Sequence, residues 1–291
     1  MKYKVREIDV DDEEYPILLR KIPDPPKKLF CKGEWKDQVF ENCLAVVGSR
    51  RMTLYGKKVL KHIFDTLNFS KLTIVSGFMT GVDACSHKCA LEKRMATVAV
   101  MPCGIDYIHP EDQVDLYNQI LTNGGLVISE YGEDSRPQLW TYPKRNRIVA
   151  GLCKAVLVVE AARGSGSLIT ADFARKFQRK VFCVPGSIFS DTSRGCLEII
   201  KDYAQPICSG IEINEYFGLG SFSCDQNLFD NFSLHGVEKR IIETLKSCPA
   251  TQDEISDFLN ISVSELSSKI TLLMLNGLVE EKEGRLYVCK N

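Results

Sequence analysis

The sequence AVLVVEAARGSGSLITADFARKFQ, residues 155–178, holds a predicted strand, a tight turn and a helix in that order. Ala155–Val159 is wholly apolar and rich in valine, which is typical of a strand buried on both faces. Residues 167–178 carry apolar side chains at helical spacing, and Gly164, Ser165 and Gly166 supply the turn. The stretch therefore predicts one strand–helix unit of a parallel sheet.

The same unit recurs on both sides of this stretch, with strand starts 24 to 29 residues apart. Apolar strands that alternate with helices at this spacing predict an α/β fold, a Rossmann-like doubly wound parallel sheet with helices on both faces. The predicted strands are Leu44–Val47, Thr73–Val75, Thr97–Met101, Leu126–Ser129, Ala155–Val159 and Val181–Val184, and the helical patterns lie at 55–69, 81–93, 111–123, 144–152 and 167–178.

The pattern changes at both ends of the chain. Residues 1–40, rich in proline and acid, are interpreted as an extended lead-in that packs on the main domain, 41–212. Residues 213–234 have no steady period and are interpreted as a linker. Residues 235–291 predict three helices, one of them opening with a capping box at residues 251–254, and a hairpin. Three helices with a two-stranded wing are typical of a small winged-helix domain.

Composition places the chain among ordinary globular proteins. It has 291 residues, of which 44% are apolar and 26% charged, and a formal net charge of −1. These values exclude wholesale disorder, a collagen-like chain and a coiled-coil rod. No apolar run approaches the roughly 20 residues of a membrane helix. The N-terminal residues MKYKVREIDVDDEEYP carry charges where a signal peptide would be apolar. We therefore expect a cytoplasmic protein with no membrane partner.

Twelve cysteines are scattered from Cys31 to Cys289 and form no tight framework. In a cytoplasmic chain they are expected to be reduced and to pack as small buried side chains. Cys85, His87 and Cys89 are residue types that bind metals and lie close together in the sequence. On a helix, however, His87 points away from the two cysteines, and no second ligand pair is evident. No metal and no cofactor is expected.

Basic residues are segregated along the chain. Residues 42–64 and 136–147 contain arginine and lysine but no acid, whereas acids concentrate at 7–14 and 280–283. This distribution indicates a positive face on a nearly neutral protein. The alternative is that the basic runs are solvated helix faces.

Small and basic residues gather where the predicted strands end. In an open α/β sheet the turns after the strands lie at one edge, where ligands bind. Glycine lets backbone N–H groups approach a phosphate, helix N-termini favour anions, and the segment TYPKRNRI (141–148) adds cations and a ring that can stack on a base. Alternatively, the arginines of that segment pair with Glu130 and Glu160. The candidate DNA-binding residues are Gly48, Ser49, Arg50, Ser76, Gly77, Tyr142, Lys144, Arg145, Asn146, Arg147, Gly164, Ser165, Gly166 and Ser167.

Motifs of several enzyme classes are missing. The first predicted strand is not followed by GxGxxG, and neither GxxxxGK[ST] nor GxSxG occurs. The four histidines show no catalytic arrangement. We therefore expect a binding protein with no catalytic residues, rather than an enzyme.

Six stretches of the chain form a distinctive set: VVGSR (46–50), SGFMTGVDACSH (76–87), ISEY (128–131), YPKRNRIVAG (142–151), VVEAARGSGSLITADFA (158–174) and VFCVPGSI (181–188). Together they resemble the DNA-processing protein A (DprA/Smf) family. The resemblance implies an extended Rossmann fold, usually dimeric, that binds single-stranded DNA, protects incoming strands and loads RecA on them in natural transformation. The chain departs from the family pattern at Phe78, at Met79 and at His109-Pro110.

Two alternatives to this function stay open. The first is a nucleotide-processing hydrolase on the same scaffold, although Thr170 stands where the related lysine-decarboxylase-like hydrolases have a catalytic glutamate. The second is a ligand-sensing transcription regulator, which the predicted winged helix would favour.

Overall fold

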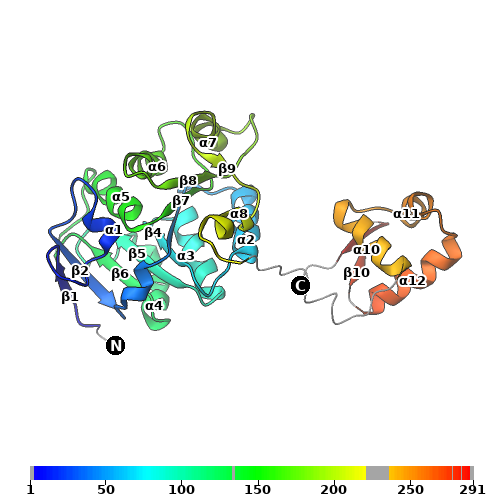
Figure 1. Ribbon diagram of the computed structural model, residues 1–291, viewed down its shortest axis with the longest axis horizontal. Coiled ribbons are helices and arrows are strands. Elements are labelled where there is room, and N and C mark those ends of the chain that lie inside the picture. The colour runs from blue at the N-terminus through cyan, green and yellow to red at the C-terminus, as the bar shows by residue number, and fades with distance from the viewer. Residues whose placement is uncertain (1–2, 133–134, 221–235, 277, 283, 289–291) are drawn as a thin grey trace. The chain divides into compact units, whose positions relative to one another are not determined.

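The computed structural model describes residues 3–132, 135–220, 236–276, 278–282 and 284–288 (Figure 1). The chain divides into two compact units, Met1–Phe222 and Ser223–Asn291, and each is described by itself.

The larger unit is built on a nine-stranded sheet with the order β1-β2-β6-β5-β4-β3-β7-β8-β9. The strands from β6 to β9 in this order are parallel to one another, as in the pairing of Leu44 with Ala155. The predicted α/β fold with a doubly wound sheet is confirmed. The predicted strands appear as β3 (Cys43–Val47), β4 (Thr73–Ser76), β5 (Ala96–Met101), β6 (Leu126–Ser129), β7 (Ala155–Val158) and β8 (Lys180–Cys183).

Helices cover both faces of this sheet, which explains why its strands read as continuous apolar runs. Alternate residues of a strand point to opposite faces. Accordingly Ala45 and Leu44 of β3 belong to two different hydrophobic clusters. One face is covered by α2 (Leu54–Thr66), α3 (Val82–Glu92), α4 (Val114–Thr122) and α8 (Ile211–Tyr216), and the other by α1 (Ile17–Arg20), α5 (Thr141–Leu152), α6 (Gly166–Lys176) and α7 (Asp191–Asp202).

The lead-in was expected only to pack on the main domain, but it also contributes strands to the sheet. It adds β1 (Arg6–Asp9) and β2 (Lys28–Gly33) to the sheet, with β2 antiparallel to β6. A short helix, η1 (Asp37–Phe40), then leads into β3, and the two-residue strand β9 (Gln205–Pro206) closes the far edge. These three strands were missed because each is only partly buried, so none of them shows a continuous apolar run.

Among the predicted boundaries that differ from the observed ones are the start of α5 and the start of the linker. Helix α5 begins at Thr141 rather than at 144, because Pro143 lies in the first turn, where its missing N–H costs no hydrogen bond. The predicted linker, 213–234, begins inside α8, where Ile213 is fully buried. The rest of that linker from 221 onward lies outside the described residues.

The smaller unit contains the three predicted helices and the hairpin around a core that includes Ile241, Leu266 and Leu286. The capping box at Thr251 and Glu254 is present as expected. No single described helix is long and apolar enough to cross a membrane; one pair reaches the required length and hydropathy only together and is bent by 117°. The elements are α10 (Val237–Ser247), α11 (Gln252–Leu259), α12 (Val263–Leu275), β10 (Val279–Lys282) and β11 (Arg285–Val288).

Candidate nucleic-acid interface

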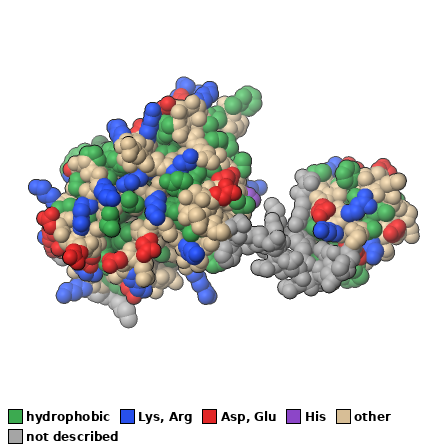
Figure 2. All heavy atoms as spheres, viewed as in Figure 1, with side chains coloured by type: hydrophobic (Ala, Val, Ile, Leu, Met, Phe, Trp, Pro, Cys, Tyr) green, Lys and Arg blue, Asp and Glu red, His purple; other side chains and the backbone are tan. Residues whose placement is uncertain are grey.

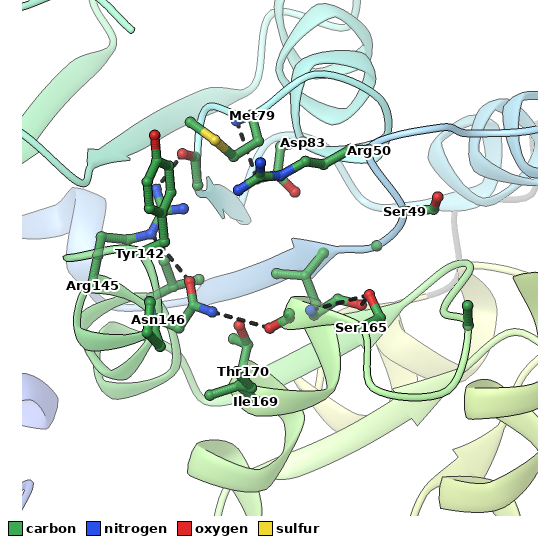
Figure 3. A pocket seen from close by; sticks show the side chains of 18 of the residues that line it. Ser49, Arg50, Met79, Asp83, Tyr142, Arg145, Asn146, Ser165, Ile169 and Thr170 are labelled. Atoms are coloured by element: carbon green, nitrogen blue, oxygen red, sulfur yellow. Dashed lines mark hydrogen bonds between the residues drawn. The ribbon is translucent and has the colours of Figure 1, made fainter. Parts of the chain in front are cut away.

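The direction of strand addition reverses between β3 and β7. From β3 the chain adds β4, β5 and β6 on one side, and β7, β8 and β9 lie on the other. In open α/β sheets, ligands bind at such a reversal, outside the carboxyl ends of the strands. A pocket of about 520 Å³ lies there, between the turn after β3 and the turn after β7 (Figure 3).

Most of the predicted site residues meet in this pocket. Those that line it are Gly48, Ser49, Arg50, Gly77, Tyr142, Arg145, Asn146, Ser165, Gly166 and Ser167. Those that do not are Ser76, Lys144, Arg147 and Gly164. The remaining lining residues, which include Arg51, Met79, Asp83, Ile169, Thr170 and Thr192, were not predicted. For Asp83 a signal was present, since the Gly81-Val82-Asp83 run follows a strand in the same way as the chosen turns.

The turn after β3 needs glycine for steric reasons. A Cβ atom on Gly48 would stand 2.6 Å from a methyl of Val82, so the backbone passes too close to α3 for any side chain. The carboxylate of Glu160, at the end of β7, accepts a hydrogen bond of 2.9 Å from the Thr53 N–H and another from its hydroxyl. Glu160 therefore holds the turn shape and does not pair with the arginines of α5.

The turn after β7 presents bare backbone to the pocket. Gly166 has open space where a Cβ atom would stand, and the Ser165 side chain caps α6 by accepting from the Ser167 N–H at 3.4 Å. Asn146 of α5 donates a hydrogen bond of 3.0 Å to the Gly166 carbonyl and so fixes this turn against α5 (Figure 3). The N-terminus of α6 thus faces the pocket, and such a terminus attracts anions.

Arg50 and Tyr142 lie together at the side of the pocket (Figure 3). The Arg50 guanidinium carbon is 5.1 Å from the centre of the Tyr142 ring, and the Tyr142 hydroxyl is 2.8 Å from His109 Nε2. Arg50 is exposed and forms no ion pair with any residue that the structure describes. Its charge is therefore available to a ligand, and the ring beside it is held in place. His109 and Met79, two departures from the family pattern, both lie at this site.

Arg145 is a structural cation in the floor of the pocket. It is 3% exposed and donates hydrogen bonds to the carbonyls of Gly77 and Val100, at the ends of β4 and β5. Burial lowers the pKa of Arg145 to about 10. Two buried carbonyls accept hydrogen bonds from the Arg145 guanidinium, which holds it in the floor, and its predicted contact with DNA stays a prediction.

Asp83 is a buried carboxyl group beside this arginine. It is 7% exposed, and its Oδ2 accepts a hydrogen bond of 3.2 Å from the Met79 N–H. Burial raises the pKa of Asp83 to about 6, against the opposing charges of Arg145 and Arg50. A Cβ atom on Gly77 would stand 2.6 Å from Arg145 Nη2 and 2.7 Å from Asp83 Oδ2. The backbone at Gly77 therefore passes closely between the two groups.

Arg147 does not line the pocket and pairs with two acids, so its contact with DNA stays a prediction. It donates hydrogen bonds to Glu130 at 2.6 Å and to Asp24 of the lead-in at 3.0 Å, and its side chain is 6% exposed. The alternative of pairing with Glu130 is the one observed. Ser76 is also turned inward, since its hydroxyl donates to the Val46 carbonyl at 2.6 Å.

Basic side chains nevertheless dominate this part of the surface. Figure 2 shows Lys and Arg side chains across the face that includes α5 and α6, whereas acidic side chains gather toward β1. Among the described residues no cluster of His, Cys, Asp and Glu could hold a metal ion. His87, which the sequence places near Cys85 and Cys89, is buried and its Nδ1 lies 2.7 Å from the Thr97 hydroxyl.

The buried Asp83 predicts a pH dependence of stability. Its pKa of about 6 in the folded chain exceeds the ordinary value of 3.8, so the folded state binds more protons than the unfolded state between these pH values. The contribution of Asp83 to the free energy of unfolding should therefore fall as the pH rises from about 4 to about 6. This contribution can be measured by urea unfolding of the wild type and of Asp83→Asn at a series of pH values between these limits. Parallel pH profiles for the two proteins would contradict the assignment.

The chain is similar in sequence to one protein family and to several of its members. The profile of the family described as DNA recombination-mediator protein A matches residues 6–218. Protein Smf of Synechocystis sp. is 40% identical over 312 aligned residues, which cover 95% of this chain and 78% of that protein. The DNA processing protein DprA of Bacillus subtilis is 35% identical over 72% of this chain and 71% of its own length.

Solved structures agree with the sequences. The X-ray structure of DNA processing protein A from Streptococcus pneumoniae superposes with a TM-score of 0.69 at 37% identity, covering 73% of this chain and 74% of that one. The structure of DNA processing protein A from Helicobacter pylori, described as having a unique single-stranded DNA binding mode, gives a TM-score of 0.65 at 29% identity, covering 74% of this chain and 96% of that one. By profile, by identity and by fold, the chain belongs to the DNA recombination-mediator protein A family, also named DprA or Smf.

Proposed function

We propose that this chain binds single-stranded DNA in the pocket between the turns after β3 and β7, protects incoming strands and loads RecA on them. The observation that carries the proposal is Arg50, an exposed cation that forms no ion pair with the described residues and lies beside the aromatic ring of Tyr142. Cations for the backbone and rings for the bases are the two elements of non-specific single-strand binding. The description of the Helicobacter pylori relative as a single-strand binder supports it.

Each part of the pocket has a role in this proposal. The guanidinium of Arg50 holds phosphate oxygens bidentately. The backbone of Gly48 and Ser49 and the N-terminus of α6, with Ser165, Gly166 and Ser167, receive a phosphate. Tyr142 stacks on a base.

A comparison of strand types tests the proposal. A labelled single strand should bind more tightly than a blunt duplex of equal length at the same salt concentration, because the concave edge suits a flexible backbone. The logarithm of the affinity should fall linearly with the logarithm of the salt concentration, since neutralised phosphates release counterions. Equal or tighter duplex binding would contradict the proposal and favour the transcription regulator.

RecA loading and dimer formation are separate parts of the proposal. With RecA present, the chain should speed the growth of RecA filaments on single strands, and light scattering should give twice the mass of the 32.7 kDa chain. The alternative of a nucleotide hydrolase has one observation in its favour, the buried carboxyl group of Asp83 in the pocket. Hydrolysis of nucleoside monophosphates that disappears in Asp83→Asn would favour that alternative.

Removal of the smaller unit should leave most of the single-strand affinity intact. In a winged helix, α12 would be the helix that reads DNA, yet Lys269 is its single cation and lies 2.8 Å from Glu238. A helix that reads a groove is expected to carry more positive charge. A chain ending at residue 222 should therefore bind single strands within about tenfold of the whole chain, or about 1.4 kcal/mol. A larger loss in a binding titration would show that the smaller unit holds the strand directly.

A further inference from the structure

A second aromatic surface lies outside the pocket, where α5 begins. Trp140 is 58% exposed and Leu139 is 92% exposed, and neither lines the pocket. The Trp140 and Tyr131 rings are 6.2 Å apart at 81°, an edge-to-face arrangement. Tyr142, two residues beyond Trp140, instead contacts Arg50 and His109. The first turn of α5 therefore separates the pocket from a surface that we call the aromatic platform, formed by Tyr131, Trp140 and Lys144.

The platform also carries a positive charge. Lys144 Nζ lies 5.7 Å from the centre of the Tyr131 ring and 5.9 Å from that of Trp140. The same ammonium is 3.4 Å from Glu130 Oε1, an oxygen that Arg147 also contacts at 2.6 Å. Because Glu130 is shared with a buried arginine, its charge is already compensated, and much of the Lys144 charge remains for an anion. The Lys144 side chain is 39% exposed, so an anion can reach it.

A surface of aromatic rings beside an ammonium group is better suited to binding a nucleotide than to binding an apolar surface of another protein. An exposed tryptophan offers a face on which any base can stack, and the neighbouring ammonium can hold the adjoining phosphate. On the side of α5, Arg136 is exposed and 136–147 contains no acid, whereas Glu130, next to Tyr131, is paired with Lys144 and Arg147. Trp140 of the platform and Tyr142 of the pocket are one residue apart at the start of α5, so a strand that leaves the pocket reaches Trp140 by crossing this turn.

We propose that a strand seated in the pocket continues over the start of α5, where one of its bases stacks on Trp140 and Lys144 holds the adjoining phosphate. This inference rests on the proposed single-strand binding and adds a second subsite to it. The pocket then holds one part of the strand and the platform another, so the platform is engaged by an oligonucleotide but not by a mononucleotide.

The two tryptophans of the chain allow a direct test. Trp35 packs on Phe40 with ring centres 4.7 Å apart, and its N–H is buried. In a Trp35→Phe protein, all tryptophan emission therefore comes from Trp140. Titration with an oligothymidylate of about 20 nucleotides should quench this emission in step with binding, followed by the anisotropy of a label on the strand. Thymidine monophosphate should leave the emission unchanged.

The outcomes separate this inference from the proposed function. Binding seen by anisotropy with no change in Trp140 emission would overturn the platform and leave the pocket standing. No binding by anisotropy would overturn both.

Affinity measurements give a second, independent readout. Trp140→Ala should weaken oligothymidylate binding by about 5- to 150-fold, which corresponds to the loss of one stacked base. Trp140→Phe should restore most of the affinity, because a ring remains. The matched control is Phe69→Ala, a 38% exposed aromatic between α2 and β4 at the opposite edge of the sheet, which should bind as the wild type does. Wild-type affinity in Trp140→Ala would also overturn the platform.

Discussion

Replacing Arg50 by alanine is expected to weaken single-strand binding by about 1.5–3 kcal/mol, the range for hydrogen bonds to charged groups. Arg50 directly follows the turn Gly48-Ser49 at the carboxyl end of β3 and lines the pocket. It is exposed and forms no ion pair with the described residues, so its removal leaves no buried charge unpaired. The melting temperature should therefore change little. A binding titration and a thermal melt of the same protein measure both effects.

Two further variants separate charge from geometry. Arg50→Lys should recover only part of the affinity, because an ammonium cannot reproduce the planar fork of a guanidinium. Lys61→Ala removes an equal charge from an exposed position on α2, outside the pocket, and should change the affinity for single strands little. If the Arg50→Ala curve overlays that of the wild type, the pocket is not where the strand binds. If the melting temperature falls with the affinity, Arg50 instead holds the turn.

The parallel part of the sheet could be predicted because its signal is local. Each central strand is buried on both faces, so runs such as Leu44–Val47 are apolar throughout. The lead-in strands gave no such signal. In β2 only Leu29 and Cys31 are buried, and the strand is defined by its pairing with β6, about 97 residues away in the chain. Long-range pairing of this kind is not encoded in a short window of sequence.

The grouping of the candidate site residues could also be predicted from a local signal, the turns that follow the strands. Turns at strand ends lie at one edge in any parallel sheet, so Gly48, Gly77 and Ser165 were placed together without a structure. The direction of the α5 side chains could not be predicted. Helical spacing places Arg145 and Arg147, two residues apart, on different sides of α5, but it does not say that Arg145 enters the pocket floor and Arg147 meets Asp24 of the lead-in. Their roles depend on partners that only the folded chain supplies.

Replacing Arg145 by methionine is expected to destabilise the fold by about 3–5 kcal/mol, the cost of removing one partner from a buried charged network. The carbonyls of Gly77 and Val100 lose the hydrogen bonds that the guanidinium donates, and the buried carboxyl group of Asp83 loses a neighbouring positive charge. Methionine fills much of the vacated space, so most of the loss comes from polar groups rather than from a cavity. Denaturant unfolding measures the change.

The double variant Asp83→Asn/Arg145→Met tests the cause. Without its arginine, Asp83 is a buried carboxyl group whose ionised form has lost a nearby opposing charge, so its neutral replacement should restore part of the stability at pH 7. Single-strand binding by Arg145→Met should fall together with its stability, because the ends of β4 and β5 carry the pocket floor. This coupling distinguishes Arg145 from Arg50, for which binding alone is lost. If Arg145→Met keeps the wild-type unfolding midpoint but loses DNA, then Arg145 contacts the strand directly, and its place in the floor is that of a ligand-binding group.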